Sequence, residues 1–359
     1  MRTTKQMWTV GMVTAGILLS GTAAPVFANQ SLTETGSSLM YPLFQQEWIP
    51  AYRAVAPKVS ISAAATGSGT GISDAIAGTV NIGASDAYLA PSEAASAPGV
   101  ENIPMAISAQ TIMYNLPGLK PSQHLKLSGN VLALIYEGKI TKWNDARIAV
   151  LNRGLPLPNK PIVTVRRSDG SGDTFLFTTL LCDTNHWWAA NVGYGTSVSW
   201  PAVQGQIGAK GNSGIVDALA KTPYSLSYVG ISYLKQALAT SPTMGEAAMQ
   251  NRAGKFVLPT PATIQAAAKV GAQHVPQDEA ISLIYEPGSD SYPLINFEYV
   301  IVNRKQPDTD TATMLKDFLQ WAISPRGGQQ AKYMTPVNFL PLPPSISALS
   351  KAQIDHIHG

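Results

Sequence analysis

The run from Arg166 to Phe175 is the part of this 359-residue chain best suited to bind an anion. It reads Arg-Arg-Ser-Asp-Gly-Ser-Gly-Asp-Thr-Phe. Its arginines offer planar guanidinium groups that match oxyanions, and its glycines let the backbone approach a ligand closely. Hydroxyl and backbone N–H groups at the start of a helix favour negative charge. A surface turn that caps a helix would produce the same residue types, so the run by itself leaves both interpretations open.

Two further segments, far away in the chain, have the same character. Residues 34–42 read Glu-Thr-Gly-Ser-Ser-Leu-Met-Tyr-Pro. Residues 66–71 read Thr-Gly-Ser-Gly-Thr-Gly, and residues 81–86 follow with Asn-Ile-Gly-Ala-Ser-Asp. The recurrence of one residue chemistry in three places favours a shared ligand site over three unrelated helix caps.

The elements next to these segments would place them at strand ends. Residues 59–63 alternate in polarity and predict a strand, residues 72–77 predict a helix, and residues 80–84 predict a second strand, which together make a βαβ unit. Residues 162–166 predict another strand that leads through the opening run into a helix at residues 174–181. Open α/β sheets bind ligands at the carboxyl ends of their strands, where these loops would lie.

The rest of the chain suggests two α/β lobes, because 359 residues exceed one ordinary core. We place the strand crossings between lobes near residues 106–115 and 292–302, with the ligand between the lobes. The Gly/Ser-rich residues 193–214 are predicted to be a loop. The remaining expected elements are strands at 111–115, 224–231 and 299–302, and helices at 131–136, 232–239 and 312–323.

Residues 1–28 have the pattern of a secretory signal peptide. Arg2 and Lys5 precede an apolar run at residues 8–19, and Val-Phe-Ala at residues 26–28 is a small-x-small cleavage site. The apolar run is shorter than the roughly 20 residues of a spanning helix. The sequence has no cysteine near the cleavage site for lipid attachment. The mature chain is therefore expected to begin at residue 29 and to be free in the periplasm.

Composition limits the other classes of function. The chain has 25 Lys+Arg against 22 Asp+Glu, which argues against a broad nucleic-acid-binding surface. Cys182 is the only cysteine, so no intrachain disulfide can form, and we expect it to be a small buried apolar residue. The five histidines are scattered without metal-ligand spacing, so no metal or cofactor is predicted.

Taken together, the three segments resemble the substrate-binding protein of bacterial ABC phosphate transporters, and the resemblance covers essentially the whole mature chain. Residues 136–145 and 292–296 match as well. The strings Gly-Ala-Ser-Asp-Ala-Tyr-Leu and Gly-Ser-Gly-Asp-Thr-Phe-Leu-Phe are most similar to the mycobacterial-type branch. The resemblance implies a two-lobed α/β periplasmic binding protein of type II with its ligand in the interlobe cleft. Lobe I would comprise residues 29–106 and 292–359, and lobe II residues 107–291.

The resemblance also implies which residues donate hydrogen bonds to phosphate. They are Ser37, Ser38 and Leu39 in the first segment, the hydroxyl of Ser68 in the second, Arg167 as the pairing cation, and Ser171 and Gly172 at the helix start. Asp169 resembles the residue that holds the arginine in place. Leu39 stands where other members have phenylalanine, and we expect little consequence because that contact is mainly through the backbone.

Two carboxylates would act as acceptors. Asp86 matches the family carboxylate that accepts a hydrogen bond from the proton of phosphate. Sulfate lacks that proton at neutral pH and would meet an unpaired like charge, a difference of up to ~5 kcal/mol. Asp173 stands where enterobacterial members have threonine, whereas mycobacterial-type members share the aspartate. A second acceptor is expected to disfavour sulfate further and to shift preference toward the more protonated phosphate.

These roles predict a non-enzymatic, high-affinity phosphate-binding protein. It would act as a monomer without a cofactor or nucleic-acid partner and deliver phosphate to a membrane permease and ATPase. A phosphatase is the first alternative, but the sequence shows no metal spacing, no Gly-x-Ser-x-Gly elbow and no phosphate-binding P-loop. The second alternative is a binding protein for another oxyanion or a phosphonate. The expected role of Asp86 argues against sulfate and molybdate as the ligand, whereas an organic phosphate stays an open alternative.

Overall fold

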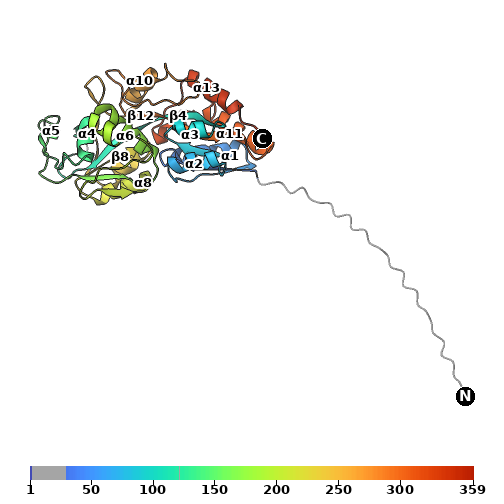
Figure 1. The fold of residues 1–359 in the computed structure, drawn as a ribbon, viewed down its shortest axis with the longest axis horizontal. Coiled ribbons are helices and arrows are strands. Elements are labelled where there is room, and N and C mark those ends of the chain that lie inside the picture. The colour runs from blue at the N-terminus through green and yellow to red at the C-terminus, as the bar shows by residue number, and fades with distance from the viewer. Residues whose placement is uncertain (2–29, 121) are drawn as a thin grey trace.

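The computed structural model describes Met1 and residues 30–120 and 122–359 (Figure 1). The predicted signal peptide, residues 1–28, lies outside the described residues apart from Met1. Within the described ranges, none of the helices combines the length and the apolar character that crossing a bilayer requires.

The strands lie mostly in one mixed sheet. In chain order they are β1 (Gln30–Gly36), β2 (Val59–Ser62), β3 (Ile82–Ser85), β4 (Val100–Asn115), β5 (Lys126–Leu127), β6 (Val163–Arg167), β7 (Ile207–Ala209), β8 (Ser225–Gly230), β9 (Met244–Glu246), β10 (Ala248–Gln250), β11 (Phe256–Val257) and β12 (Ile295–Asn303). Among the described residues the main sheet has the order β2-β1-β3-β12-β4-β8-β6-β7, with β9 beside β4. The strands β11, β10 and β5 form a small second sheet.

Helices cover both halves of the main sheet (Figure 1). They are α1 (Ile49–Val55), α2 (Ser68–Ala77), α3 (Pro91–Ser96), α4 (Gly129–Tyr136), α5 (Ala146–Ala149), α6 (Gly172–Thr184), α7 (His186–Asn191), α8 (Gly211–Lys221), α9 (Leu234–Thr240), α10 (Pro261–Gly271), α11 (Thr309–Ile323), α12 (Ala331–Met334) and α13 (Pro344–Asp355). Short irregular helices are η1 (Leu43–Trp48), η2 (Ile231–Tyr233) and η3 (Thr335–Val337). Helices α1, α2 and α11 pack on the β1–β3 half, and α6 and α8 pack on the β6–β8 half.

Two long strands join the halves. β4 pairs with β12 over residues 100–109 and with β8 over residues 110–115, so it belongs to both halves. The pairing of β12 with β4 is irregular between Glu298 and Tyr299. On the β4 side Pro104 has no N–H to donate, and the carbonyl of Met105 accepts instead from Nε2 of Gln329 at 2.9 Å. The irregularity thus lies inside the ladder between β4 and β12, ahead of the point where β4 begins to pair with β8.

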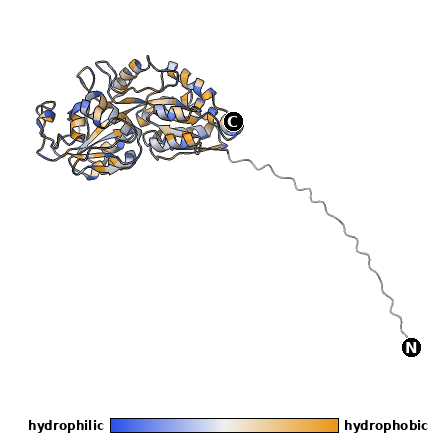
Figure 2. Cartoon of the chain, viewed as in Figure 1, coloured by the Kyte–Doolittle hydropathy of each residue, from blue (hydrophilic) through white to orange (hydrophobic). Residues whose placement is uncertain are grey.

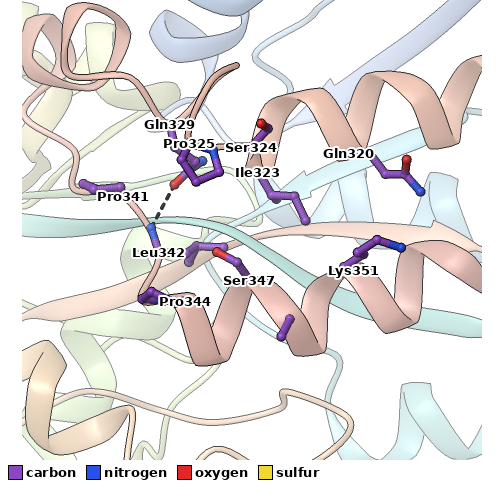
Figure 3. A pocket seen from close by; sticks show the side chains of 11 residues that line it. Gln320, Ile323, Ser324, Pro325, Gln329, Pro341, Leu342, Pro344, Ser347 and Lys351 are labelled. Atoms are coloured by element: carbon purple, nitrogen blue, oxygen red, sulfur yellow. Dashed lines mark hydrogen bonds between the residues drawn. The ribbon is translucent and has the colours of Figure 1, made fainter.

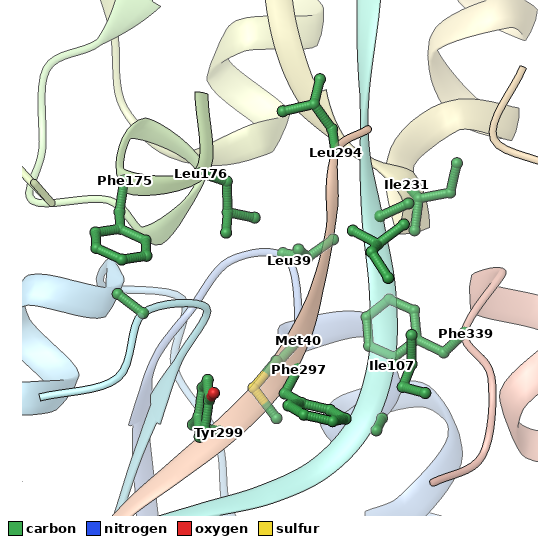
Figure 4. Packing of buried hydrophobic residues seen from close by; sticks show 14 of the residues in the cluster. Leu39, Met40, Ile107, Phe175, Leu176, Ile231, Leu294, Phe297, Tyr299 and Phe339 are labelled. Atoms are coloured by element: carbon green, nitrogen blue, oxygen red, sulfur yellow. The ribbon is translucent and has the colours of Figure 1, made fainter. Parts of the chain in front are cut away.

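The apolar core runs through both halves without a break. Figure 4 shows Leu39, Met40 and Phe297 packed in the first half, with Leu176 of α6 on the other side. A smaller cluster lies between α8 and the strands β6 and β8. Hydrophilic residues gather on the outer helices and loops (Figure 2). Burial of the two apolar faces of the sheet is what fixes the strand ends relative to one another.

The two predicted strand–loop–helix units are confirmed as β2–α2 and β6–α6. The prediction of a loop at residues 193–214 is wrong in its last part, where β7 and the start of α8 occur. Glycines at positions 208, 211 and 214 lower the local propensity, but burial of Ile215, Val216 and Leu219 stabilises the helix. The strand β1 was not expected. Cys182 is half-buried against the core rather than fully buried.

Candidate anion-binding site

The three Gly/Ser-rich segments come together between the two halves of the sheet. Ser37 directly follows β1, Asp86 directly follows β3, and Arg167 is the last residue of β6. Because β1 and β3 are parallel neighbours, their carboxyl ends bring Ser37 and Asp86 side by side. Helices α2 and α6 begin at Ser68 and Gly172, and the first N–H groups of a helix have no acceptor within that helix. The strand ends therefore collect donors around one point.

The residues where the three segments meet are almost completely buried. All of the predicted site residues are buried except Asp169, which is partly exposed. The side chain of Leu39 points into the apolar core, and its N–H donates to Oγ of Ser37 at 3.1 Å (Figure 4). Ser171 caps α6, because its Oγ accepts from the N–H of Thr174 at 3.3 Å. Leu39 can thus offer only backbone, and the capping interpretation holds for the Ser171 hydroxyl.

Asp86 is surrounded by hydrogen-bond donors from its own half of the sheet. Oγ of Ser37 donates to Oδ1 of Asp86. Oγ of Ser68 lies 3.4 Å from Oδ2 and accepts from the Asp86 N–H at 3.2 Å. Burial, followed by the charge of Asp173, raises the pKa of Asp86 to about 7. A carboxyl group with this pKa can accept or give up a proton in the range where phosphate also does.

Arg167 is fixed by two aspartates. Its Nε lies 2.8 Å from Oδ1 of Asp169 and its Nη2 2.5 Å from Oδ2 of Asp169, a bidentate pair. Its Nη1 lies 2.8 Å from Oδ2 of Asp173. The sequence indicated the first of these contacts but not the second. Fixing the guanidinium in advance reduces the loss of side-chain freedom when a ligand binds.

Asn212 and Gln110 complete the network, and neither was expected from the sequence. Nδ2 of Asn212 donates to Oδ2 of Asp173 at 2.7 Å and to Oγ of Ser38 at 3.0 Å. The Asn212 N–H also donates to Oγ of Ser38, at 3.1 Å, so Asn212 connects the two halves. Nε2 of Gln110 lies 3.2 Å from Oδ1 of Asp173. Asn212 is the second residue of α8, in the segment that was predicted to be a loop.

Glycines allow the two halves to meet closely. The N–H of Gly69 at the start of α2 donates to the carbonyl of Gly170 at 3.1 Å. A β-carbon on Gly67 would lie 2.5 Å from that same carbonyl oxygen, and the φ of Gly67 is +105°. Only glycine adopts such a backbone freely while leaving room for an opposing chain. The loop between β2 and α2 thus closes directly onto the loop between β6 and α6.

The cluster has the chemistry of an anion site with a built-in acceptor. Among the described residues, no group of three or more His, Cys, Asp or Glu side chains is arranged to hold a metal ion. A larger hollow of about 710 Å³ lies elsewhere, between α11 and α13 (Figure 3). It is lined mainly by apolar groups such as Ile323, Pro341 and Leu342, and it contains none of the predicted site residues. The buried donors and the carboxylates of the cluster suit a small oxyanion that carries a proton.

Comparison with known proteins agrees with the interpretation of the cluster as an anion-binding site. A family model described as a PBP superfamily domain matches residues 21–326. The fold is shared with a solved structure of a high affinity periplasmic phosphate-binding protein bound with phosphate, with a TM-score of 0.72 and 21% identity over 90% of this chain and 93% of that chain. The fold and the cluster between its halves define a two-lobed α/β binding protein of type II, as predicted.

Relatives with higher sequence identity show to which family of binding proteins the chain belongs. The phosphate-binding protein PstS of Haemophilus influenzae is 36% identical over 338 residues, which cover 94% of this chain and 96% of the relative. The phosphate-binding protein PstS 3 of Mycobacterium leprae is 29% identical over 369 aligned positions, with 96% of each chain covered. The chain therefore belongs to the PstS family of phosphate-binding proteins, and the family resemblance seen in the sequence is confirmed.

Proposed function

We propose that this protein captures inorganic phosphate between its lobes and delivers it to an ABC importer. The observation that carries the proposal is the buried carboxylate of Asp86, which lies among hydroxyl donors and opposite the start of α6. Only a ligand that both accepts and donates hydrogen bonds satisfies such a site. Phosphate near neutral pH is such a ligand, and membership of the PstS family supports the same choice.

The donors to phosphate are proposed to come from both lobes. Backbone N–H groups at Ser38, Leu39 and Gly172 would approach the phosphate oxygens. The Ser68 hydroxyl, which lies 3.4 Å from Oδ2 of Asp86 without ligand, would turn from Asp86 to a phosphate oxygen. Arg167 would supply the positive charge from its fixed position between two aspartates. We propose that Ser37 and Ser171 act mainly by orienting their neighbours, since their hydroxyls already bond to Asp86 and Thr174.

The acceptors are proposed to set selectivity. Asp86 would accept the proton of phosphate and leave sulfate with an unpaired like charge. Asp173 would add a second acceptor. A carboxylate can accept about four hydrogen bonds, and Asp173 receives them from Arg167, Asn212 and Gln110. One lone pair then remains for a proton of the ligand.

We further propose that the chain divides into lobe I, residues 29–106 and 292–359, and lobe II, residues 107–291. The long strands β4 and β12 join the two halves of the sheet and support that division. The protein would be exported through its N-terminal signal, act as a monomer and carry out no catalysis. A membrane permease with its ATPase would receive the phosphate once the lobes separate.

Isothermal titration of the refolded mature protein tests the proposal. Refolding removes carried-over anion, and the ligands are phosphate, sulfate and methylphosphonate. We expect one phosphate per chain and no heat from sulfate. Asp86→Asn should weaken phosphate binding and reduce the preference over sulfate, whereas Asp74→Asn on the outer part of α2 should change neither. If the folded protein binds methylphosphonate but not phosphate, the natural ligand is instead an organophosphorus compound.

A further inference from the structure

Glu298 is a buried carboxyl group directly behind the proposed phosphate site. It lies in β12, next to the irregular pairing with β4, and its side chain is fully buried. Oγ of Ser108 on β4 donates to its Oε1. Among the described residues no donor reaches its Oε2. No role for this residue was expected from the sequence.

The neighbours of Glu298 are mostly negative. The antiparallel pairing of β12 with β3 puts Tyr299 opposite Ser85, so the next residues along the two chains, Glu298 and Asp86, lie beside each other. The charge of Asp173 in α6 also acts on Glu298. Tyr299 follows it in β12. The cation of the cluster, Arg167, is bound to Asp169 and Asp173. No positive charge in this group therefore pairs with Glu298.

A hydrogen bond between two carboxyl groups needs a proton, because two ionised carboxylates are both acceptors only. Burial, followed by the charge of Asp86, raises the pKa of Glu298 well above its ordinary value. Asp86 has hydroxyl donors on both of its oxygens, whereas Glu298 has a donor on one. The ionised form is thus better stabilised on Asp86, and the shared proton belongs on Glu298.

We propose that Glu298 is a positioning residue that keeps its proton and donates a hydrogen bond to Asp86, so that Asp86 stays ionised and faces the ligand as an acceptor. This inference rests on the proposed phosphate-binding function. It predicts that phosphate affinity falls at alkaline pH, because ionisation of Glu298 places a second negative charge against Asp86 and removes its donor.

Phosphate titrations from pH 6 to pH 9.5 test the inference with Glu298→Gln, which carries a permanent donor of the same shape. At pH 7 the variant should bind phosphate within about threefold of the natural protein. At pH 9 it should bind at least tenfold more tightly, because its donor cannot be lost. Glu279→Gln is the matched control, since Glu279 is also buried and bonded to Ser350 and Gln353 but is remote from Asp86 in the hydrogen-bond network. It should follow the natural profile.

Superimposable pH profiles for Glu298→Gln and the natural protein would overturn the inference, as would loss of binding at pH 7 in a variant that is folded. A second variant, Ser108→Ala, covers the case in which Glu298→Gln does not fold. Without the Ser108 hydroxyl the ionised form of Glu298 is less stable, so the alkaline decline should move up by about one pH unit. A decline that stays in place or moves down contradicts the assignment.

Infrared spectroscopy separates this inference from the proposed function. The difference spectrum between the unliganded natural protein and Glu298→Gln at pH 7 should contain a protonated-carboxyl C=O band, because the band of buried Glu34 is common to both proteins and cancels. Glu279→Gln should retain the Glu298 band. If phosphate does not bind at any pH but this band is found, the function is wrong and the protonated Glu298 stands. If phosphate binds and the band is missing, the function stands and the role of Glu298 is wrong.

Discussion

Gly172 and Asp86 face each other across the two halves so closely that a β-carbon on Gly172 would lie 2.5 Å from the β-carbon of Asp86. Real β-carbons do not approach other atoms to that distance, so one of the two residues would have to move. Asp86 cannot move freely, because Ser37 and Ser68 hold its carboxylate. The approach of the halves at this point therefore depends on a missing side chain.

Gly172→Ala is expected to keep the lobes from closing fully while leaving each lobe folded. Forcing an extra methyl group into a packed site costs ~1–3 kcal/mol, which corresponds to about a 5- to 150-fold weaker affinity for phosphate. Gly214→Ala in α8 is the control, because its β-carbon would meet its nearest neighbour at an ordinary 3.7 Å. Titration calorimetry decides the matter, and equal affinities for the two variants would show that this contact does not limit closure.

Arg167→Lys is expected to weaken phosphate binding by about two orders of magnitude. A single ammonium group cannot replace a guanidinium that contacts Asp169 and Asp173 together, and breaking a buried ion pair costs ~3–5 kcal/mol. The neighbouring Arg166 bonds to Gln206 and lies over Trp200 instead. Arg166→Lys should therefore stay within threefold of the natural affinity, and similar losses in both variants would contradict this division of roles.

Asn212→Asp is expected to make phosphate binding strongly dependent on pH. The amide nitrogen lies 2.7 Å from Oδ2 of Asp173, so a carboxylate at position 212 would place two negative oxygens in contact. The variant should bind nearly normally at pH 5, where one of the pair can hold a proton, and at least tenfold more weakly at pH 8. The control is Asn191→Ala at an exposed position in α7. A flat pH profile for Asn212→Asp would refute the bridging role.

Glu34→Gln should stabilise the protein at pH 8 more than at pH 5. Burial raises the pKa of Glu34 from 4.5 to about 8, so the native state keeps a proton that the unfolded chain loses above pH ~4.5. The native protein consequently loses stability as pH rises from about 4.5 to about 8, whereas glutamine does not titrate. Scanning calorimetry should give a Tm for the variant several degrees higher at pH 8. The exposed Asp290→Asn should show no such trend.

The sequence was informative where function and local structure coincide. The Gly/Ser-rich segments around Ser68 and Ser171 are typical of a helix start, and a strand precedes each of them. The position of these segments at the sheet edge and their ability to bind an anion could therefore be predicted together. Asp86 could be found because it follows a short apolar strand at the same sheet edge. The α/β class followed from the same alternation of strand and helix patterns.

Asn212, Gln110 and Glu298 could not be found in this way. Gln110 and Glu298 interrupt apolar strands, and a single polar residue in a strand gives no sign of the partner that satisfies it. Asn212 lies in a Gly-rich stretch whose helix forms because of tertiary packing. The role of each of these side chains depends on a partner more than 30 positions away in the sequence, such as Asp173 for Asn212. Local pattern carries no information about such pairs.

The irregular pairing beside Glu298 has a mechanical consequence. β12 ties the two halves together, and a strand bends most readily where its ladder is broken. Rotation of one half about this point also turns the side chain that lies behind Asp86. If the halves separated about this point, the bound anion would be exposed to water and the carboxyl groups beneath it would shift in the same movement. A membrane partner that stabilises the open shape would need no residue of its own in the cleft to expel the cargo.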